Sequence, residues 1–297
     1  MDSYISNAAG QQNNEHYLQS ALERTAEQIL SQEEQQQPYA RFFHDRVEAP
    51  DPRHYQLMDA PCDPALAIFP HQMNDLLNPG ELAIETGWCN LPDGTGFIAN
   101  RNLYPDITPE MIDWWFAWHP LEDLRYRIWY PPQHAGISVS AEHRARLLDT
   151  SIPIRQRNWG VLHHVIEDTN SGMSHVDIQF MSPQDFGFDM TRWKAPYVAT
   201  FAGGQGWSVP VGHAGGRKAP ALMCHIFRQT AAGLEHRTRF WIGYQLVDGK
   251  PQSVLPPGVS VPASVIQGLA QHNVCEFTRF KTFLPEVYQQ FGGEITA

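Results

Sequence analysis

The stretch Ser264-Val265-Ile266-Gln267-Gly268-Leu269-Ala270-Gln271-His272-Asn273-Val274-Cys275-Glu276-Phe277-Thr278-Arg279-Phe280 lies near the end of this 297-residue chain. Its apolar residues recur at close to the helical period, and Gly292 and Gly293 follow as a stop signal. The pattern therefore predicts a long helix over 263–292. A helix with one apolar stripe must bury that stripe against another element. The apolar positions are Ile266, Leu269, Val274, Phe277 and Phe280.

Two polar residues of this stretch share one face of the predicted helix. His272 and Glu276 are four residues apart, so their side chains stack about one turn from each other. Phe277 and Phe280 flank them, which indicates that this face turns inward. An unpaired buried charge is costly, so the pair needs a partner. Two explanations remain open at this point: a bound metal ion, or a local hydrogen bond or ion pair.

Composition and charge narrow the class of protein. The net charge of −11 argues against nucleic acid or an anionic membrane as the main partner. No apolar run approaches the ~20 residues of a membrane span, and the N-terminus shows no signal peptide. The four cysteines are widely scattered without a Cys-x2-Cys pair, which predicts reduced thiols in a cytoplasmic protein. The many aromatic and histidine side chains suit an aromatic-walled pocket, and also a large core.

The chain divides into a short N-terminal region and a larger domain. Within residues 1–80 we expect one amphipathic helix over 17–30, followed by proline-rich, extended and irregular structure over 38–80. The domain over 81–297 begins with strand-like runs at 82–86 and 96–100. Thr108 and Pro109 then open a helix that ends at His119. The alternation over 125–130 predicts a further strand.

From residue 158 onward the pattern is mostly that of strands. Candidate strands cover 159–168, 175–182, 197–202, 219–229 and 234–246, split by glycine- and proline-rich turns. Consecutive strands without intervening helices indicate an antiparallel sheet. The C-terminal helix can bury its apolar stripe only on one face of that sheet. The sequence thus predicts an α+β fold, a curved antiparallel sheet that grips the helix, with a cavity between them.

Three further residues are candidates for a site with His272 and Glu276. His134 follows two prolines, although an isolated histidine of this kind is commonly an exposed loop residue. Strict alternation places Glu167 on the same strand face as His163 and Val165, yet a glutamate near a strand end is often solvated. His225 lies on an inward strand, where a hydrogen-bonded core histidine is the ordinary case. Two histidines and two glutamates would suit Zn²⁺, because imidazole nitrogens and carboxylate oxygens both bind this metal.

Several rare aromatic blocks resemble a known family. They run, in order, as Trp114-Trp115-Phe116-x-Trp118-His119, Arg125-Tyr126-Arg127-x-Trp129-Tyr130-Pro131, Glu235-x-Arg237-Thr238-Arg239-Phe240-Trp241-x-Gly243 and Leu284-Pro285-x-Val287-Tyr288. Together with His134 and His272-x3-Glu276, they resemble the 2,4-diacetylphloroglucinol hydrolases and phloretin hydrolases over about residues 80 to 290.

This resemblance implies a fold, a metal and a set of ligands. The fold would be a Bet v 1-like helix-grip domain, with the N-terminal part used to form a homodimer. The metal would be Zn²⁺ in a cytoplasmic enzyme that acts on a small aromatic ketone. The ligands fall on His134, Glu167, His272 and Glu276, and a tyrosine that hydrogen-bonds a substrate hydroxyl falls on Tyr126. Ile137 departs from the family pattern, because it stands where a polar anchor for a ring hydroxyl is expected.

The reaction implied by the resemblance is hydrolysis of a carbon–carbon bond in a ketone. The bond joins an acyl group to a phenolic ring of the phloroglucinol type, and the products are the deacylated ring and a carboxylic acid. Tautomerisation of the phenol to a ketone places a proton on the ring carbon, so that water attack on the acyl group can expel an enolate. Tyr126 would assist that step, and His225 or His213 would move the proton. Trp129 and Tyr244 are the further candidates for contact with the substrate.

Two other functions are compatible with the same residues. A helix-grip protein can be a carrier of apolar aromatic ligands, which would need no convergence of the four metal-binding candidates. A zinc enzyme of this shape could also be a lyase or cyclase that acts on a polyketide. Metal analysis separates the carrier from the enzymes, and product analysis separates the enzymes from each other.

Overall fold

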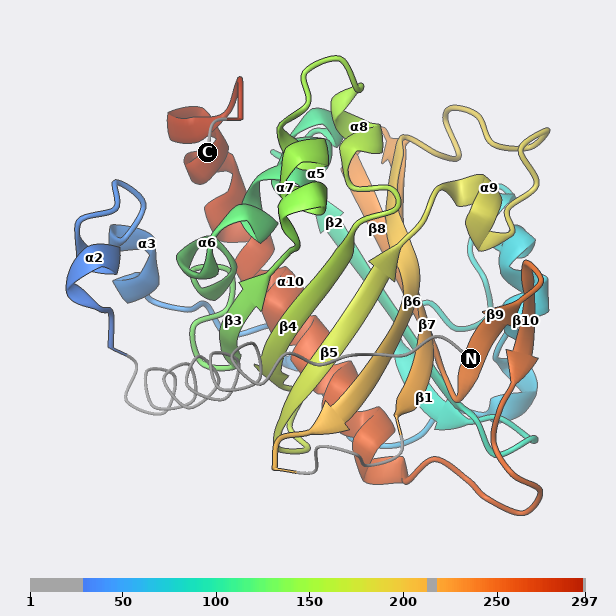
Figure 1. Ribbon diagram of the computed structural model, residues 1–297. Helices are drawn as coiled ribbons and strands as arrows, with labels where there is room; N and C mark the ends of the chain where they lie inside the picture. Colours follow the sequence, from blue (N-terminus) through green and yellow to red (C-terminus); the bar gives the residue numbers. More distant parts are fainter. Residues whose placement is uncertain (1–28, 213–217, 296–297) are drawn as a thin grey trace, which may run out of the picture.

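The long C-terminal helix α10 (Ala263–Phe291) crosses one face of a curved antiparallel sheet (Figure 1). The computed structural model describes residues 29–212 and 218–295. The helix begins after Pro262 and ends at Gly292, as its apolar period and the terminal glycines predict. Its buried side chains include Ile266, Val274 and Phe277. The predicted arrangement of a sheet wrapped on a C-terminal helix is confirmed.

Eight strands form the main sheet, in the order β1-β2-β8-β7-β6-β5-β4-β3, and every neighbouring pair is antiparallel. A separate two-stranded sheet pairs β9 with β10. The strands of the main sheet are β1 (Gly87–Asn90), β2 (Gly96–Tyr104), β3 (His134–Ser138), β4 (Leu162–Asp168), β5 (Met173–Phe180), β6 (Thr200–Pro210), β7 (Ala219–Thr230) and β8 (Gly233–Ile242), and the small sheet consists of β9 (Tyr244–Val247) and β10 (Lys250–Ser253).

Helix α5 (Pro109–Trp118) packs its tryptophans into the core beside α10. Thr108 caps it, because its side chain accepts a hydrogen bond from the backbone N–H of Met111. Trp115 lies edge-on to Phe283 of α10, with ring centroids 5.1 Å apart. The helix predicted between Thr108 and His119 is therefore confirmed. The remaining helices after it are η3 (His119–Leu121), α6 (Asp123–Arg127), α7 (Ala141–Leu148), α8 (Ile154–Arg157) and α9 (Pro183–Phe186).

The predicted strand over 125–130 is wrong, because this segment forms α6 and the turn after it. The amides of Ile128 and Trp129 donate to the carbonyl oxygens of Leu124 and Tyr126. All side chains from Leu124 to Trp129 are buried, including two arginines. Ion pairs make this possible, since Arg127 contacts Glu34 at 2.6 Å. Alternation in the sequence did not correspond to alternating exposure.

The region before residue 81 is more helical than predicted. It holds α2 (Gln32–Gln35), α3 (Arg41–His44), α4 (Pro52–Gln56), η1 (Pro64–Leu66) and η2 (Pro70–Leu77). Met73 and Leu76 of η2 join a buried cluster with Trp241 of β8, so this segment packs on the sheet. The helix expected over 17–30 lies almost entirely outside the described residues. The strand expected at 82–86 is wrong, and β1 begins only at Gly87.

Two other strand predictions differ from the structure in their boundaries. The strand expected over 234–246 is split by Gly243, whose φ of 93° suits glycine and turns the chain from β8 into β9. The strand expected over 197–202 begins at Thr200 and continues to Pro210. Among the described residues, no helix is both long and apolar enough to cross a membrane. The four cysteines are free thiols.

Candidate metal and substrate site

A cavity of about 420 Å³ lies between α10 and the sheet. Its walls come from α5, α6, α10 and strands β3 to β8, and most of them are apolar. On β4 the residues His163, Val165 and Glu167 face it, as their period of two predicts. Gly268 lets α10 approach the turn after β4 closely, because a Cβ there would lie 2.6 Å from the carbonyl oxygen of Thr169. Cavities of this size and character bind small organic molecules.

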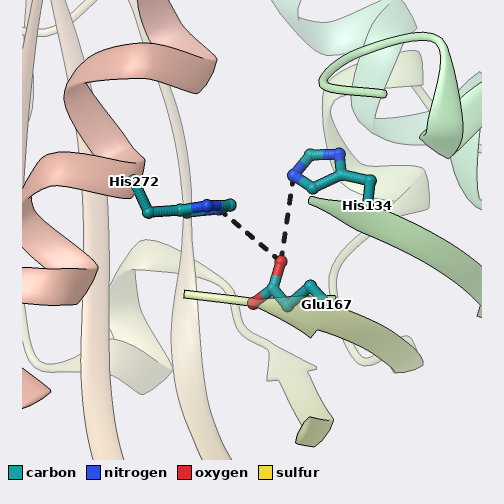
Figure 2. A group of neighbouring side chains, drawn as sticks. All are labelled: His134, Glu167 and His272. Atoms are coloured by element: carbon teal, nitrogen blue, oxygen red, sulfur yellow. Dashed lines mark ion pairs between the residues drawn. The ribbon is translucent and has the colours of Figure 1, made fainter. Parts of the chain in front are cut away.

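Four side chains converge at one side of this cavity. Figure 2 shows His134 of β3, Glu167 of β4 and His272 of α10 pointing at one another. Glu167 Oε2 lies 3.9 Å from His134 Nε2 and 3.8 Å from His272 Nε2. Glu276 joins them, since its Oε2 lies 3.6 Å from His134 Nε2 and 3.8 Å from His272 Nε2. The register explains the first contact, because His134 pairs directly with Glu167 across β3 and β4.

These distances match the spacing of atoms around a metal ion. Bonds of ~2.1 Å in a tetrahedron place neighbouring ligand atoms ~3.4 Å apart, close to the four nitrogen–oxygen distances observed. His134 Nε2 is buried without a hydrogen-bond partner, which is costly unless a cation receives its lone pair. A donor set of two imidazoles and two carboxylates suits Zn²⁺. His134, Glu167 and His272 are therefore able to bind a metal, and Glu276 lies beside the two histidines as a further donor.

Neighbouring polar groups orient three of the four side chains. His134 Nδ1 donates to the carbonyl oxygen of Tyr126 at 3.1 Å, and His272 Nδ1 donates to Gln133 Oε1 at 2.8 Å. Both contacts leave Nε2 as the atom that faces the site. Asn273 Nδ2 donates to Glu276 Oε1 at 3.0 Å, which leaves Oε2 free to face the histidines. Such outer contacts fix the rings and carboxylates of metal sites.

Burial shifts the pKa values of three of the four groups towards their neutral forms. Burial raises the pKa of Glu276 to about 8, against the opposing effect of His272. Burial lowers the pKa of His134 and of His272 to about 4, so both imidazoles are neutral at pH 7. Neutral imidazoles offer a lone pair to a metal. A divalent cation would reverse the effect of burial on Glu276 and favour its carboxylate form.

Three of the predicted catalytic and substrate-binding residues line the same cavity. Tyr126 stacks on His134 with ring centroids 4.0 Å apart, and its hydroxyl donates to Glu167 Oε2. Trp129 stands edge-on to His134, and its indole N–H donates to the carbonyl oxygen of Glu276 at 3.0 Å. His225 lies on β7, with Nδ1 3.0 Å from His236 Nε2, and it also faces the cavity.

Tyr244, another of the predicted residues, is not brought to this site. Tyr244 follows Gly243 and leaves the cavity face with the turn into β9. Its hydroxyl donates to Asp93 Oδ2 at 2.6 Å, and the residue does not contribute to the cavity wall. His213 lies outside the described residues. Ile137 does line the cavity and is apolar there, as its departure from the family pattern implies.

Sequence reasoning missed several polar residues at the site. Gln133 precedes His134 in the chain and orients His272, and Asn273 follows His272 and orients Glu276. His119 and His163 line the far end of the cavity. Only His163 carried a usable signal, since alternation along β4 placed it on the face of Glu167.

Comparisons with known proteins agree with the residue pattern. Residues 68–289 match a family described as the DAPG hydrolase PhiG domain. Phloretin hydrolase of Eubacterium ramulus is 31% identical over 265 residues, which cover 88% of this chain and 93% of that protein. The 2,4-diacetylphloroglucinol hydrolases of a Pseudomonas sp and of Pseudomonas protegens are each 26% identical over 276 residues, covering 86% of this chain and 88% and 85% of theirs. The resemblance is thus confirmed, and the chain is an enzyme that belongs to the DAPG hydrolase family.

Proposed function

We propose that this protein is a zinc-dependent hydrolase that cleaves the carbon–carbon bond between an acyl group and a phenolic ring of the phloroglucinol type. The observation that carries the proposal is the convergence of four donor atoms, from β3, β4 and α10, at distances of 3.6–3.9 Å. The names of the relatives, which are hydrolases of phloretin and of 2,4-diacetylphloroglucinol, support the substrate class.

His134, Glu167, His272 and Glu276 would hold the zinc ion. When bound, the ion supplies Lewis acidity towards a carbonyl oxygen and lowers the pKa of a coordinated water. The residues around it hold their donor atoms in place before the metal binds, because Gln133, Asn273 and the backbone of Tyr126 fix three of the four groups.

Tyr126 positions the phenol and exchanges a proton with it. Its hydroxyl donates to Glu167 Oε2, so its oxygen is left to accept the hydrogen of a ring hydroxyl. Burial, together with the charge of Glu167, raises the pKa of Tyr126 well above its usual value, which keeps the hydroxyl protonated at pH 7. Tyr126 therefore remains a hydrogen-bonding hydroxyl and does not ionise on its own.

His225 is the group placed to move the ring proton. Burial lowers its pKa to about 3, so the imidazole is neutral at pH 7 and has one nitrogen with a free lone pair. Its Nδ1 is occupied by contacts to His236 Nε2 at 3.0 Å and Thr238 Oγ1 at 3.1 Å. Nε2 remains for the substrate. Proton transfer between the ring oxygen and the ring carbon gives the keto form, whose cleavage by water yields an enolate and a carboxylic acid.

The apolar walls exclude bulk water and hold the ring. Trp129 and Phe240 both face the cavity, and a ring held between such side chains loses much of its hydration. We propose no substrate contact for Tyr244, because its hydroxyl binds Asp93 outside the cavity.

Three wider features belong to the same proposal. The curved sheet around α10 supports a Bet v 1-like helix-grip domain over 81–297. Residues 1–80 would serve a homodimer, and sedimentation of the purified protein at two chain masses would agree with this. The free cysteines support a cytoplasmic location.

The test is product analysis with and without metal. Purified enzyme is incubated with monoacetylphloroglucinol, then stripped with a chelator and resupplied with Zn²⁺. We expect phloroglucinol and acetic acid in equal amounts, loss of both after chelation, and recovery with zinc. A protein that binds the ketone without turning it over would contradict the proposal and favour a carrier. Products other than the deacylated ring and the acid would favour a lyase or cyclase.

A further inference from the structure

Two buried histidines, His119 and His163, line the cavity and are not among the candidate metal ligands. They are 2% and 1% exposed, and their ring centroids are 5.6 Å apart. We call them the imidazole pair. His119 comes from η3, after α5, and His163 comes from β4. His163 and Glu167 are four residues apart on this strand, so their backbone positions lie ~13 Å apart along β4.

Each imidazole of the pair has one nitrogen bound to the protein. His119 Nδ1 donates to the carbonyl oxygen of Trp115 at 2.8 Å, and His163 Nε2 donates to Asn158 Oδ1 at 2.9 Å. A carbonyl oxygen only accepts, so the proton of each neutral ring is fixed on that nitrogen. His119 Nε2 and His163 Nδ1 are thus bare acceptors. In the described part of the chain neither has a hydrogen-bond partner.

Aromatic side chains pack against both imidazoles. Phe116 lies 5.5 Å from His119, and Phe180 lies 4.5 Å from His163, measured between ring centroids. The nearby hydroxyl of Tyr126 donates to Glu167, and the serines that line the cavity lie on other parts of its wall. Ser174, for example, pairs with Glu167, whereas Leu162, next to His163, pairs with Gln179 at the other end of the strand. Both imidazoles line the cavity, so a ligand bound there can supply the donor that each bare nitrogen lacks.

We propose that the imidazole pair is a hydroxyl-binding subsite, in which His119 Nε2 and His163 Nδ1 accept hydrogen bonds from phenolic hydroxyls of the substrate. A hydroxyl carries the hydrogen that these atoms need, whereas a ketone oxygen does not. The pair would therefore attract a hydroxylated ring and repel the acyl oxygen, which directs that oxygen to the metal-binding group. The identity of the substrate in this inference rests on the proposed function. The ability of the pair to accept hydrogen bonds does not.

The spacing suits a phenol bound between the two groups. His119 lies 6.1 Å from Tyr126, and Tyr126 lies 4.0 Å from His134, measured between ring centroids. A ring whose acyl oxygen is at the metal-binding group can thus pass Tyr126 and reach His119. Burial lowers the pKa of His119 to about 3 and that of His163 well below its usual range, so both rings stay neutral acceptors at pH 7. The apolar side chain of Ile137 cannot hold a hydroxyl of the substrate ring by a hydrogen bond. In this proposal the imidazole pair holds that hydroxyl instead.

The hydroxyl can come from the ring that is released or from a ring on the acyl arm. Probes that carry no acyl–ring bond separate these sources, because the enzyme cannot hydrolyse them. The probes are phloroglucinol, and a propanoic acid that carries a para-hydroxyphenyl ring, with its counterpart that lacks the hydroxyl. Their affinities for the zinc-loaded enzyme are measured by titration calorimetry. The variants are His119→Phe and His163→Phe, which keep a ring and remove the acceptor. His164→Phe, on the opposite and exposed face of β4, is the matched control.

We expect each variant of the pair to weaken the probe that occupies the subsite by about fivefold, the usual worth of one neutral hydrogen bond. His164→Phe should leave every affinity unchanged. A loss for phloroglucinol assigns the subsite to the released ring, and a loss for the hydroxylated acid alone assigns it to the acyl arm. Unchanged affinities for both probes, in variants that fold and bind zinc, would overturn the proposal.

A measurement on the wild-type enzyme covers the case in which the variants fail to fold. With ¹⁵N-labelled histidine, saturation with the probe should shift the resonances of His119 Nε2 and His163 Nδ1, because accepting a hydrogen bond changes the shielding of that nitrogen. No shift at either nitrogen would also overturn the proposal. Zinc content and hydrolysis are measured on the same wild-type sample. A protein that shows the shifts but has neither bound zinc nor hydrolytic activity would refute the proposed function and still support the hydroxyl-binding subsite.

Discussion

Gln133 offers a test of the metal-binding group through a residue that does not itself face the metal. Its Oε1 accepts from His272 Nδ1 at 2.8 Å, and its Nε2 donates to Asn170 Oδ1 at 2.8 Å. The second contact fixes the amide, so the first one holds the proton of His272 on Nδ1 and points Nε2 at the site. Gln133→Leu keeps most of the side-chain volume and removes both contacts.

The size of the effect follows from the role of such outer partners. Loss of one typically weakens metal binding by about 10–100-fold, or about 1.4–2.7 kcal/mol at 25 °C. We expect Gln133→Leu to fall within that range. Gln133→Glu should bind zinc more tightly than Gln133→Leu, because a carboxylate is a stronger acceptor for the Nδ1–H of His272.

The assay is competition for zinc with a chromophoric chelator at constant pH. Gln267→Ala is the matched control. Gln267 lies on α10, the helix that carries His272, and its side chain donates to the carbonyl oxygen of Met58 at 3.0 Å, away from the ligands. Its zinc affinity should equal that of the wild type. If Gln133→Leu binds zinc as tightly as the wild type, His272 is not held as the structure indicates, and the reasoning is refuted.

Two further predictions concern catalysis and stability. Tyr126→Phe should keep its zinc and lower kcat by about 100-fold, because the substrate loses its proton partner; an unchanged kcat in steady-state assays would remove Tyr126 from the mechanism. The second prediction concerns Glu85. Burial alone would raise the pKa of this carboxyl, but the guanidiniums of Arg239 and Arg237 lower it to about 2. The ionised Glu85 therefore contributes to the free energy of unfolding above the unfolded pKa of ~4.3, and this contribution is lost as the pH falls towards 2. Glu85→Gln should therefore lower the free energy of unfolding by about 3 kcal/mol at pH 7, and the difference from wild type in urea melts should narrow in acid. A difference that does not change with pH would contradict this.

Helices with caps and clear periods could be predicted well from the sequence. α10 and α5 agree with their predicted bounds within about one residue, because apolar spacing and terminal residues both mark them. The segment over 125–130 could not be predicted in this way. Its arginines are buried by partners far away in the chain, such as Glu34, and local alternation carries no information about them.

The site shows the same division between local and distant information. The face of β4 that carries Glu167 follows from its period of two, and His272 and Glu276 follow from the helical spacing. The contact of His134 with Glu167 depends on the register of β3 against β4, which single-sequence patterns do not specify. Tyr244 was misplaced because the positive φ of Gly243 turns the chain out of the sheet.

The central claim is that one zinc ion binds between His134, Glu167, His272 and Glu276. The most direct measurement is anomalous X-ray scattering at the zinc absorption edge from crystals of the purified enzyme. The account predicts one strong peak per chain, ~2.0–2.2 Å from both Nε2 atoms and from an oxygen of each carboxylate. A peak elsewhere, or none at these side chains after crystals are soaked in zinc, would contradict it.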